Sequence, residues 1–193
     1  MKNLVIGTIA AATKVFSVAV SAHEHEGASN ALVKDKLQAI AGDAAVISAV
    51  NAQNTKTSGY DQGKIDSLDK QWRAETQASA KPMIEEVLAN ALSQHLKGVA
   101  DASEGLLTEV FVMDAKGLNV GQSAPTSDFW QGDEAKWKKT YGAGPGAVFI
   151  DKVEEDESTQ SFQTQINLAV TDPASGKVIG AITFGVNAEM LLQ

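Results

Sequence analysis

The sequence contains no cysteine and few aromatic residues, and its acidic side chains outnumber the basic ones. Of its 193 residues, 6% are aromatic, 16 are Lys or Arg and 24 are Asp or Glu. Without cysteine the chain cannot form disulfides, thiolate zinc sites, iron–sulfur clusters or a thiol nucleophile. The net charge of −8 argues against binding to nucleic acid, because phosphate contacts require a basic face.

The common enzyme and cofactor motifs are also missing. The sequence has no His-Glu-x-x-His motif, no Gly-x-Ser-x-Gly motif and no dinucleotide- or phosphate-binding loop. We therefore expect no catalytic residue, no cofactor, no metal site and no enzyme activity. A hydrolase would have to use His95, which lies on an apolar stripe. The 44% of hydrophobic residues suffice for the core of one domain.

The first residues have the pattern of an export signal. A short positive start, Met1-Lys2-Asn3, precedes an apolar stretch over 4–20, and Val20-Ser21-Ala22 has the small residues of a signal-peptidase site. This pattern predicts a signal peptide over 1–22 and a periplasmic mature protein. The alternative is an uncleaved membrane anchor, although Lys14 interrupts the apolar stretch.

Two segments carry metal-ligating side chains, and we expect both to be solvated. Cleavage would expose His23-Glu24-His25-Glu26, within a segment over 23–29 that we expect to be disordered. The alternative for this segment is a Cu(II) or Ni(II) site that uses the free amine and His25. The acidic run Glu154-Glu155-Asp156-Glu157-Ser158 favours an exposed loop, with calcium binding as the alternative.

Residues 30–105 have a helical pattern. Apolar residues recur every three or four positions, Asp43 is a candidate cap for a second helix, and 54–63 is polar enough for a loop. Pro82 suits the first turn of a further helix. The clearest stripe predicts one long helix that packs on a sheet and offers a surface for a homodimer: Ile84, Val87, Leu88, Ala91, Leu92, His95, Leu96 and Val99. His95 is expected to be a core histidine with a hydrogen-bond partner.

Residues 106–193 have the pattern of strands joined by short turns. Strands are expected over 107–113, 118–122, 147–153, 161–171 and 177–187, with a hairpin turn at Asp114-Ala115-Lys116-Gly117. Over 161–171 apolar and polar residues alternate, so Gln165 and Asn167 share a polar face. Short connections make the sheet antiparallel, which predicts an α+β fold with a long helix on a five- to six-stranded sheet.

A long insertion over 123–146 separates two of these strands and holds most of the large rings. On a helix, Trp130, Trp137 and Tyr141 would share one face, because they are seven and four residues apart. Rings that face Gln165 and Asn167 would form a small pocket with a few directed hydrogen bonds. The alternative is that the rings seal the sheet as ordinary core.

Several segments together resemble the Cache superfamily of PAS-like extracytoplasmic sensor domains. They are the long helix, residues 110–117, the Trp-containing insertion, and the ending over 172–187. The resemblance covers 30–193 and implies a PAS-like sheet with a ligand pocket under the insertion. It implies an exported sensor domain that binds a small molecule and acts in trans on a membrane sensor kinase or chemoreceptor. The alternative is a periplasmic adaptor or scaffold without a ligand.

Two positions depart from the members of this superfamily that bind amino acids. Those members keep an arginine beside the tryptophan of the insertion and an aspartate at the end of the last strand. Here Ser127-Asp128-Phe129 precedes Trp130, and Asn187 ends the last strand. We therefore expect a small polar ligand other than an α-amino acid, with carboxylates among the candidates and Lys138 or Lys139 as possible cations. The expected ligand contacts are Trp130, Trp137, Tyr141, Gln165, Asn167 and Asp128.

Overall fold

The computed structural model describes residues 25–156 and 161–193. The predicted signal peptide, the first residues of the predicted copper or nickel site and part of the acidic run lie outside the described residues. Residues 25–29 are helical, whereas the sequence predicted disorder over 23–29. No helix among the described residues combines the length and the apolar character that a membrane span requires.

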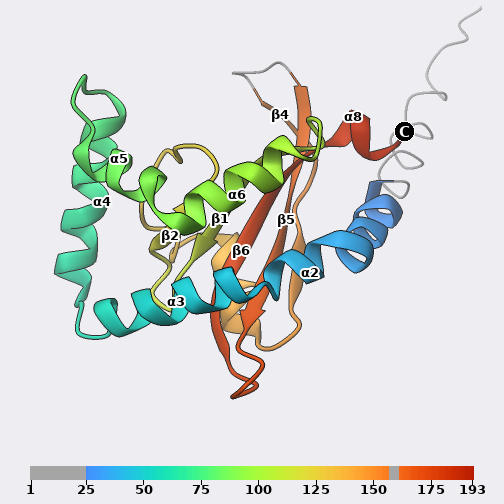
Figure 1. Ribbon diagram of the computed structural model, residues 1–193. Helices are drawn as coiled ribbons and strands as arrows, with labels where there is room; N and C mark the ends of the chain where they lie inside the picture. The colour runs from blue at the N-terminus through green and yellow to red at the C-terminus, as the bar shows by residue number, and fades with distance from the viewer. Residues whose placement is uncertain (1–24, 157–160) are drawn as a thin grey trace, which may run out of the picture.

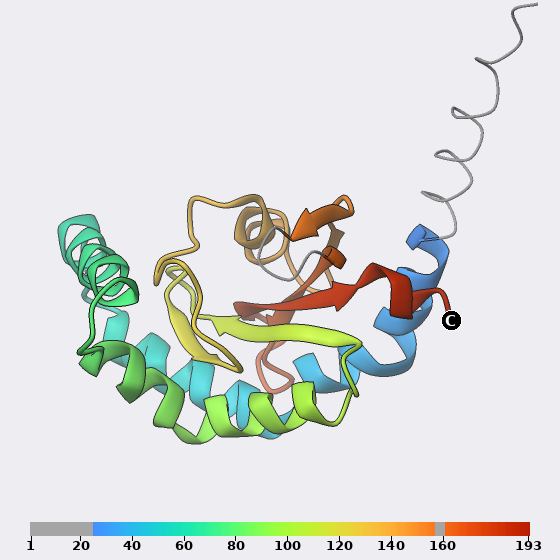
Figure 2. The same cartoon turned by 90° about the horizontal axis from the view of Figure 1, so that it is seen from above.

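The fold is α+β, as predicted, with helices on one face of an antiparallel sheet and the insertion on the other (Figure 2). The strand order is β2-β1-β6-β5-β3, and β4 pairs with the beginning of β5. All of these pairs are antiparallel. The strands are β1 (Leu107–Met113), β2 (Asn119–Gln122), β3 (Val148–Ile150), β4 (Glu154–Asp156), β5 (Ser161–Thr171) and β6 (Val178–Asn187).

The helical part is divided into several segments (Figure 1). After a π-helical turn η1 (Val33–Leu37) come α2 (Gln38–Ala41), α3 (Ala44–Thr57), α4 (Gln62–Thr76), α5 (Pro82–Ala89) and α6 (Ala91–Asp101); the insertion holds α7 (Ala135–Lys138) and η2 (Tyr141–Ala143), and α8 (Ala188–Leu191) ends the chain. Asp43 caps α3, because its side chain accepts a hydrogen bond from the N–H of Ala45. Pro82 lies in the first turn of α5.

Two predictions for the helices were wrong. The stripe over 84–99 is not one helix, because Asn90 is extended (φ −69°, ψ 159°) and separates α5 from α6. The Asn90 side chain accepts from the N–H of Ser93 and donates to the carbonyl of Val120, so the break is held by both a cap and a tertiary contact. The predicted loop over 54–63 is short, since α3 continues to Thr57 and α4 begins at Gln62.

His95 is also not the core histidine that the stripe predicted. Its side chain is 37% exposed, and its Nε2 lies 3.5 Å from Oδ2 of Asp43 at the beginning of α3. The break at Asn90 turns α6 relative to α5, so the two helices do not present one continuous face.

The main core lies between the helices and the sheet. On this face β1, β5 and β6 contribute buried aliphatic side chains and Phe184, and η1, α3 and α6 cover them. The helices approach closely where the strand carries glycine. A Cβ at Gly121 would come within 3.0 Å of the Leu92 side chain, so the glycine lets α6 approach β2.

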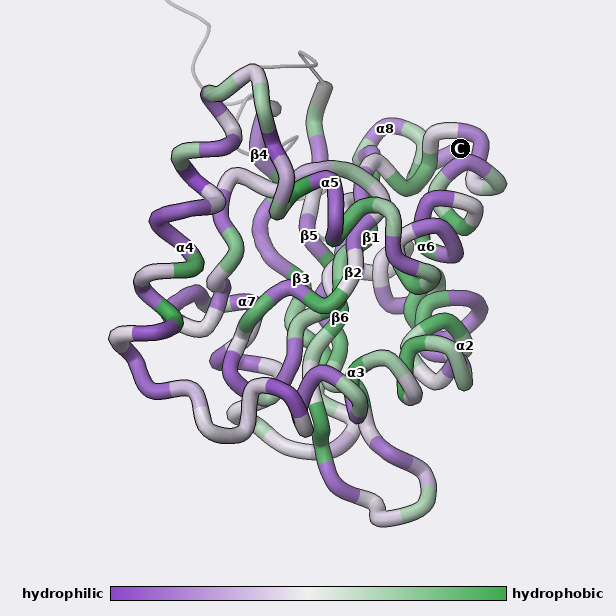
Figure 3. Tube along the Cα trace, turned by 60° about the vertical axis from the view of Figure 1, so that its left-hand side comes forward, coloured by the Kyte–Doolittle hydropathy of each residue, from purple (hydrophilic) through white to green (hydrophobic). Residues whose placement is uncertain are grey.

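The opposite face is more polar and smaller. Phe111, Met113 and Ala181 form an apolar patch, beside which Gln165, Asn167 and Thr183 follow along β5 and β6. Hydropathy along the chain shows that apolar residues concentrate in the strands and the sheet-facing helices, while α4 is hydrophilic for most of its length (Figure 3). The insertion covers the polar face (Figure 2).

Candidate functional site

The turn between β1 and β2 anchors the insertion. The indole N–H of Trp130 donates to the carbonyl of Lys116 (2.8 Å), and that of Trp137 donates to the carbonyl of Asp114 (3.1 Å). The backbone N–H of Gln131 donates to the carbonyl of Gly117 (2.7 Å). The two tryptophans are therefore held by backbone groups of one hairpin turn.

Asp114 holds this turn in shape. Its Oδ1 accepts from the N–H groups of Lys116 (2.8 Å) and Leu118 (2.9 Å), and its Oδ2 accepts from the hydroxyl of Thr57 on α3 (2.9 Å). Burial raises the pKa of the Asp114 carboxyl, although these hydrogen bonds act in the opposite direction. Asp114 thus connects the turn to α3.

Helix α4 holds the other side of the insertion. Oδ1 of Asp69 accepts from the N–H groups of Phe129 (2.9 Å) and Trp130 (3.0 Å). Arg73 pairs with Asp69 (2.7 Å) and with Asp128 (3.0 Å). The side chain of Asp128 also accepts from the amide of Gln131. These contacts place Asp128 and Trp130 at the contact between α4 and the insertion, where they have structural partners.

Trp137 and Tyr141 lie against the apolar patch on the polar face of the sheet. Their rings are stacked with centroids 4.6 Å apart and an interplanar angle of 20°. They pack against Phe111, Met113 and Ala181, and both are half-buried. The rings therefore close this part of the sheet as a small separate core.

The two polar sheet residues differ in what they can offer to a ligand. Asn167 is fully buried, and its amide donates to the carbonyls of Phe149 (2.9 Å) and Gln165 (3.2 Å) while its Oδ1 accepts from the hydroxyl of Thr183 (2.7 Å). Gln165 is half-buried and donates to Oε1 of Glu109 (3.2 Å). Asn167 has its partners within the sheet, whereas Gln165 reaches the surface of the polar face.

A cavity of about 280 Å³ lies on this face, between the insertion and the strands β4 and β5. Of the six predicted ligand contacts, only Gln165 lines it. Its lining is Glu134, Ala135, Lys136, Asp151, Lys152, Glu154, Glu155, Gln163 and Gln165. This cavity is the candidate site, because charged and polar side chains from the insertion and from the strands converge on it.

Lys136 is the most enclosed cation of the cavity. Its side chain is only 14% exposed, its Nζ lies 3.0 Å from Oε2 of Glu134, and the same Nζ is 5.3 Å from the centre of the Phe111 ring. A cation near a ring face gains from the ring quadrupole. Lys138 and Lys139, the cations considered from the sequence, are exposed, and Lys139 lies 4.0 Å from the centre of the Phe149 ring. Nothing in the local sequence distinguishes Lys136 from these neighbours.

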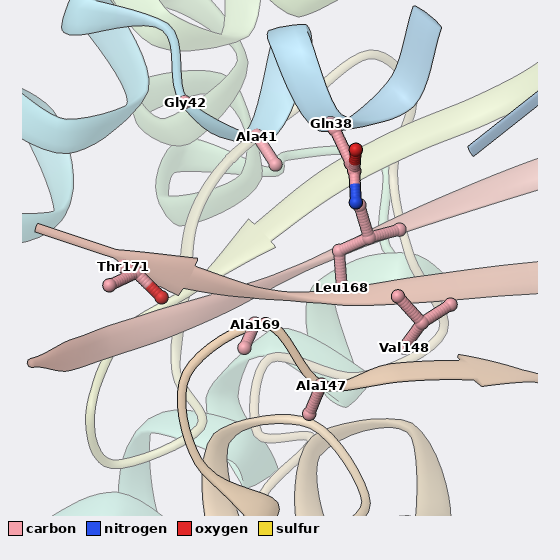
Figure 4. A pocket seen from close by; sticks show the side chains of 9 residues that line it. Gln38, Ala41, Gly42, Ala147, Val148, Leu168, Ala169 and Thr171 are labelled. Atoms are coloured by element: carbon pink, nitrogen blue, oxygen red, sulfur yellow. The ribbon is translucent and has the colours of Figure 1, made fainter. Parts of the chain in front are cut away.

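A smaller pocket lies elsewhere in the fold and offers no comparable chemistry. Where α2 passes over the edge of the sheet, Gln38 points toward Leu168 on β5, above Val148 (Figure 4). The pocket measures about 140 Å³, and none of its lining side chains is charged. Among the residues that the structure describes, no group of three or more His, Asp and Glu side chains is placed to hold a metal ion.

Comparison with known proteins finds similarity among solved structures. No protein family and no curated protein matches the sequence. Among solved structures, the chain is similar to the sensor domain of the V. cholerae histidine kinase DctB (12% identity, TM-score 0.47, covering 93% of this chain and 59% of that one). It is also similar to the ligand-binding domain of the Campylobacter jejuni chemoreceptor Tlp3 in complex with 4-methylisoleucine (13% identity, TM-score 0.42, covering 87% and 62%).

A third similar structure is the ligand-binding domain of the Pseudomonas aeruginosa chemoreceptor PctC in complex with GABA (12% identity, TM-score 0.37, covering 94% of this chain and 66% of that one). The chain thus spans about 60% of the length of the first two of these solved domains. These three solved structures are sensor or ligand-binding domains of a histidine kinase and of two chemoreceptors.

Proposed function

We propose that the mature chain is an exported, periplasmic sensor domain that binds a small polar molecule in the cavity on the polar face and acts on a membrane sensor kinase or chemoreceptor. The observation that carries this proposal is the cavity itself, in which the enclosed Lys136 and the sheet residue Gln165 share one lining. Polar groups placed in a concave site fix the orientation of a small ligand and give specificity.

The charges of the lining favour a ligand with an ammonium group. Four carboxylates line the cavity, from Glu134, Asp151, Glu154 and Glu155, against two ammonium groups. Both lysines already have partners, because Lys136 pairs with Glu134 and Lys152 with Glu154. A ligand that carried only a carboxylate would meet an excess of negative charge, so an amine-bearing ligand is the better match.

A ligand in this cavity could alter the surface that a partner contacts. Glu134 lies at the start of α7 and Lys136 within it, and the insertion around them is held at both sides by hydrogen bonds to α4 and to the β1–β2 turn. A ligand that moved Lys136 away from the Phe111 ring of β1 would remove a contact between α7 and the sheet. The partner would then recognise the position of α7.

The test is a thermal-shift and calorimetric screen of amines, amino acids, carboxylates and sugars against the full mature chain. We expect an amine-bearing compound to raise the melting temperature, by an amount equivalent to about 2.7 kcal/mol at a hundredfold excess over Kd. Binding should also change tryptophan fluorescence, because Trp137 follows Lys136 directly.

Variants of the lining locate the binding. Gln165→Leu and Glu155→Gln should weaken binding, whereas Glu189→Gln, an exposed carboxylate on α8 outside the cavity, should leave it unchanged. The proposal fails if no compound shifts the melting temperature, or if the shift persists in both lining variants.

A second function, a ligand-independent adaptor, is favoured by a different observation. Trp137 and Tyr141 pack onto the sheet, and Asn167 has all of its partners within it, so much of the polar face is filled. An adaptor would bind the ectodomain of a membrane kinase with the same affinity whether or not any compound of the screen was present. Pull-down with that ectodomain, with and without the compounds, separates the two functions.

A further inference from the structure

A third cavity, larger than the two already described, lies among the helices, away from the polar face. It measures about 420 Å³ and lies between α3, α4, α5 and the edge strand β2. Figure 1 shows how these elements are arranged. Its lining is Gln53, Lys56, Thr57, Tyr60, Leu68, Gln71, Pro82, Met83, Glu86, Val87, Asn90, Leu118, Asn119, Val120 and Phe129. Its volume lies within the range of small-ligand sites.

The floor of this cavity is apolar. Leu118 and Phe129 are buried there, and Leu68, Met83 and Val87 on the helices above are only half-buried. The cavity exists because α4 packs mainly on α5 and on the insertion, through the stacking of Trp72 on Phe129 and the hydrogen bonds of Asp69, and so stands away from β2. An apolar group placed here would bury surface on several sides.

The cavity does not offer a strand edge. The outer carbonyls of β2 are already used, since Gln53 donates to the carbonyl of Asn119 (2.9 Å) and Asn90 donates to that of Val120 (2.9 Å). A peptide that added to the sheet here would have to displace both amides. Recognition in this cavity must therefore come from side chains.

Two opposite charges line the cavity without pairing. Lys56, in the last turn of α3, and Glu86, on α5, are both exposed. Neither forms an ion pair with any residue that the structure describes, and so the two do not pair with each other. A molecule that carried both charges on an apolar body could satisfy both groups while it covered the floor.

We propose that this cavity binds a small amphipathic zwitterion. Its apolar body lies against Leu118 and Phe129, its carboxylate meets Lys56, and its ammonium group meets Glu86. This site is separate from the cavity on the polar face, and it goes beyond the function proposed for that one. The expectation of a ligand other than an α-amino acid concerns the pocket under the insertion, not this cavity. Because Phe129 belongs to the insertion, a bound ligand would also reinforce the contact between α4 and the insertion.

Four probes test the chemistry by calorimetry or by chemical-shift changes in the full mature chain. L-phenylalanine carries both charges and an apolar ring, glycine lacks the ring, 3-phenylpropanoate lacks the ammonium group, and phenethylamine lacks the carboxylate. Exposed ion pairs are weak, so removal of either charge should weaken binding by up to about fivefold. Removal of the ring should have a larger effect. Tighter or equal binding of glycine would overturn the proposal, as would a failure of phenylalanine to bind.

Variants locate the site and keep the test independent of folding defects. Val87→Trp should abolish phenylalanine binding by filling the cavity, and Lys56→Gln and Glu86→Gln, at exposed positions, should each weaken it by up to about fivefold. Glu85→Gln, the neighbouring exposed carboxylate outside the lining, is the matched control and should bind normally.

Gln165→Leu separates this proposal from the previous one. Phenylalanine binding that survives Gln165→Leu and is lost in Val87→Trp supports the site among the helices. Binding that is lost in Gln165→Leu and survives in Val87→Trp belongs to the cavity on the polar face and overturns the site proposed here. Unchanged affinity in both charge variants would also overturn it.

Discussion

Substitution of Gly117 by alanine tests whether the β1–β2 turn anchors the insertion. Gly117 has a φ of +79°, and a Cβ at this position would lie 2.4 Å from Cα and 2.5 Å from N of Gly132 in the insertion. The positive φ costs about 1–2 kcal/mol for a residue with a Cβ. The overlap is with backbone, so the insertion itself must move, which costs a further ~1–3 kcal/mol. We therefore expect Gly117→Ala to lower the free energy of unfolding by about 2–5 kcal/mol.

Gly176→Ala is the matched control. Gly176 has a similar φ of +68°, but a Cβ there would meet nothing within 4 Å. This variant should lose only the conformational cost of about 1–2 kcal/mol. The difference between the two variants isolates the close approach between the turn and the insertion.

Urea denaturation monitored by tryptophan fluorescence provides the measurement. The native spectrum of Gly117→Ala should also change before global unfolding, because the indole N–H of Trp130 is bound to the adjacent carbonyl of Lys116. If the two variants lose the same free energy and keep the same native spectrum, the insertion is not held by this turn.

Three further predictions concern groups that join the helices to the sheet and to one another. Burial raises the pKa of the Asp114 carboxyl in the folded state, so protonation favours the folded state. The free energy of unfolding, relative to that of Asp114→Asn, should rise as the pH falls through this raised pKa and level off below the ordinary pKa of aspartate. Urea titrations at several pH values measure it. Asn90→Ala should cost about 1–2 kcal/mol by loss of the α6 cap, and faster amide exchange should appear at the start of α6. Glu75→Ala should lower the free energy of unfolding by about 2 kcal/mol, because the Glu75 carboxylate accepts from two N–H groups at the start of α5. Circular dichroism should show that the main sheet is intact.

Most of the strand half was predictable because its signals are local, but β4 was not, since the sequence predicted a loop over the acidic run that begins at Glu154. Alternation along β5 placed Gln165 and Asn167 on one face, and the register confirms that each lies beside β6 on that face. The cap at Asp43 and the first-turn position of Pro82 were predicted for the same reason, since both depend on residues within one turn.

The arrangement of the aromatic rings was not predictable from spacing. The predicted common face required one helix from Trp130 to Tyr141, but α7 covers only Ala135–Lys138. Trp130 instead forms a bridge with Leu118 and hydrogen bonds with Asp69, which is distant in the sequence. Contacts with α4 and the hairpin turn decide its place, and no local pattern reports them.

The sequence by itself determined the α+β class, the alternating faces of β5 and the cap at Asp43, because these depend on periodicity and on neighbours within a few residues. Tertiary structure alone decided that Lys136 is the enclosed cation and that the hydrogen-bonding groups of Asn167 have partners within the sheet. It also decided that α4 stands away from β2 and leaves the cavity among the helices. Each of these depends on which distant side chains meet, and therefore on how the space between elements is filled.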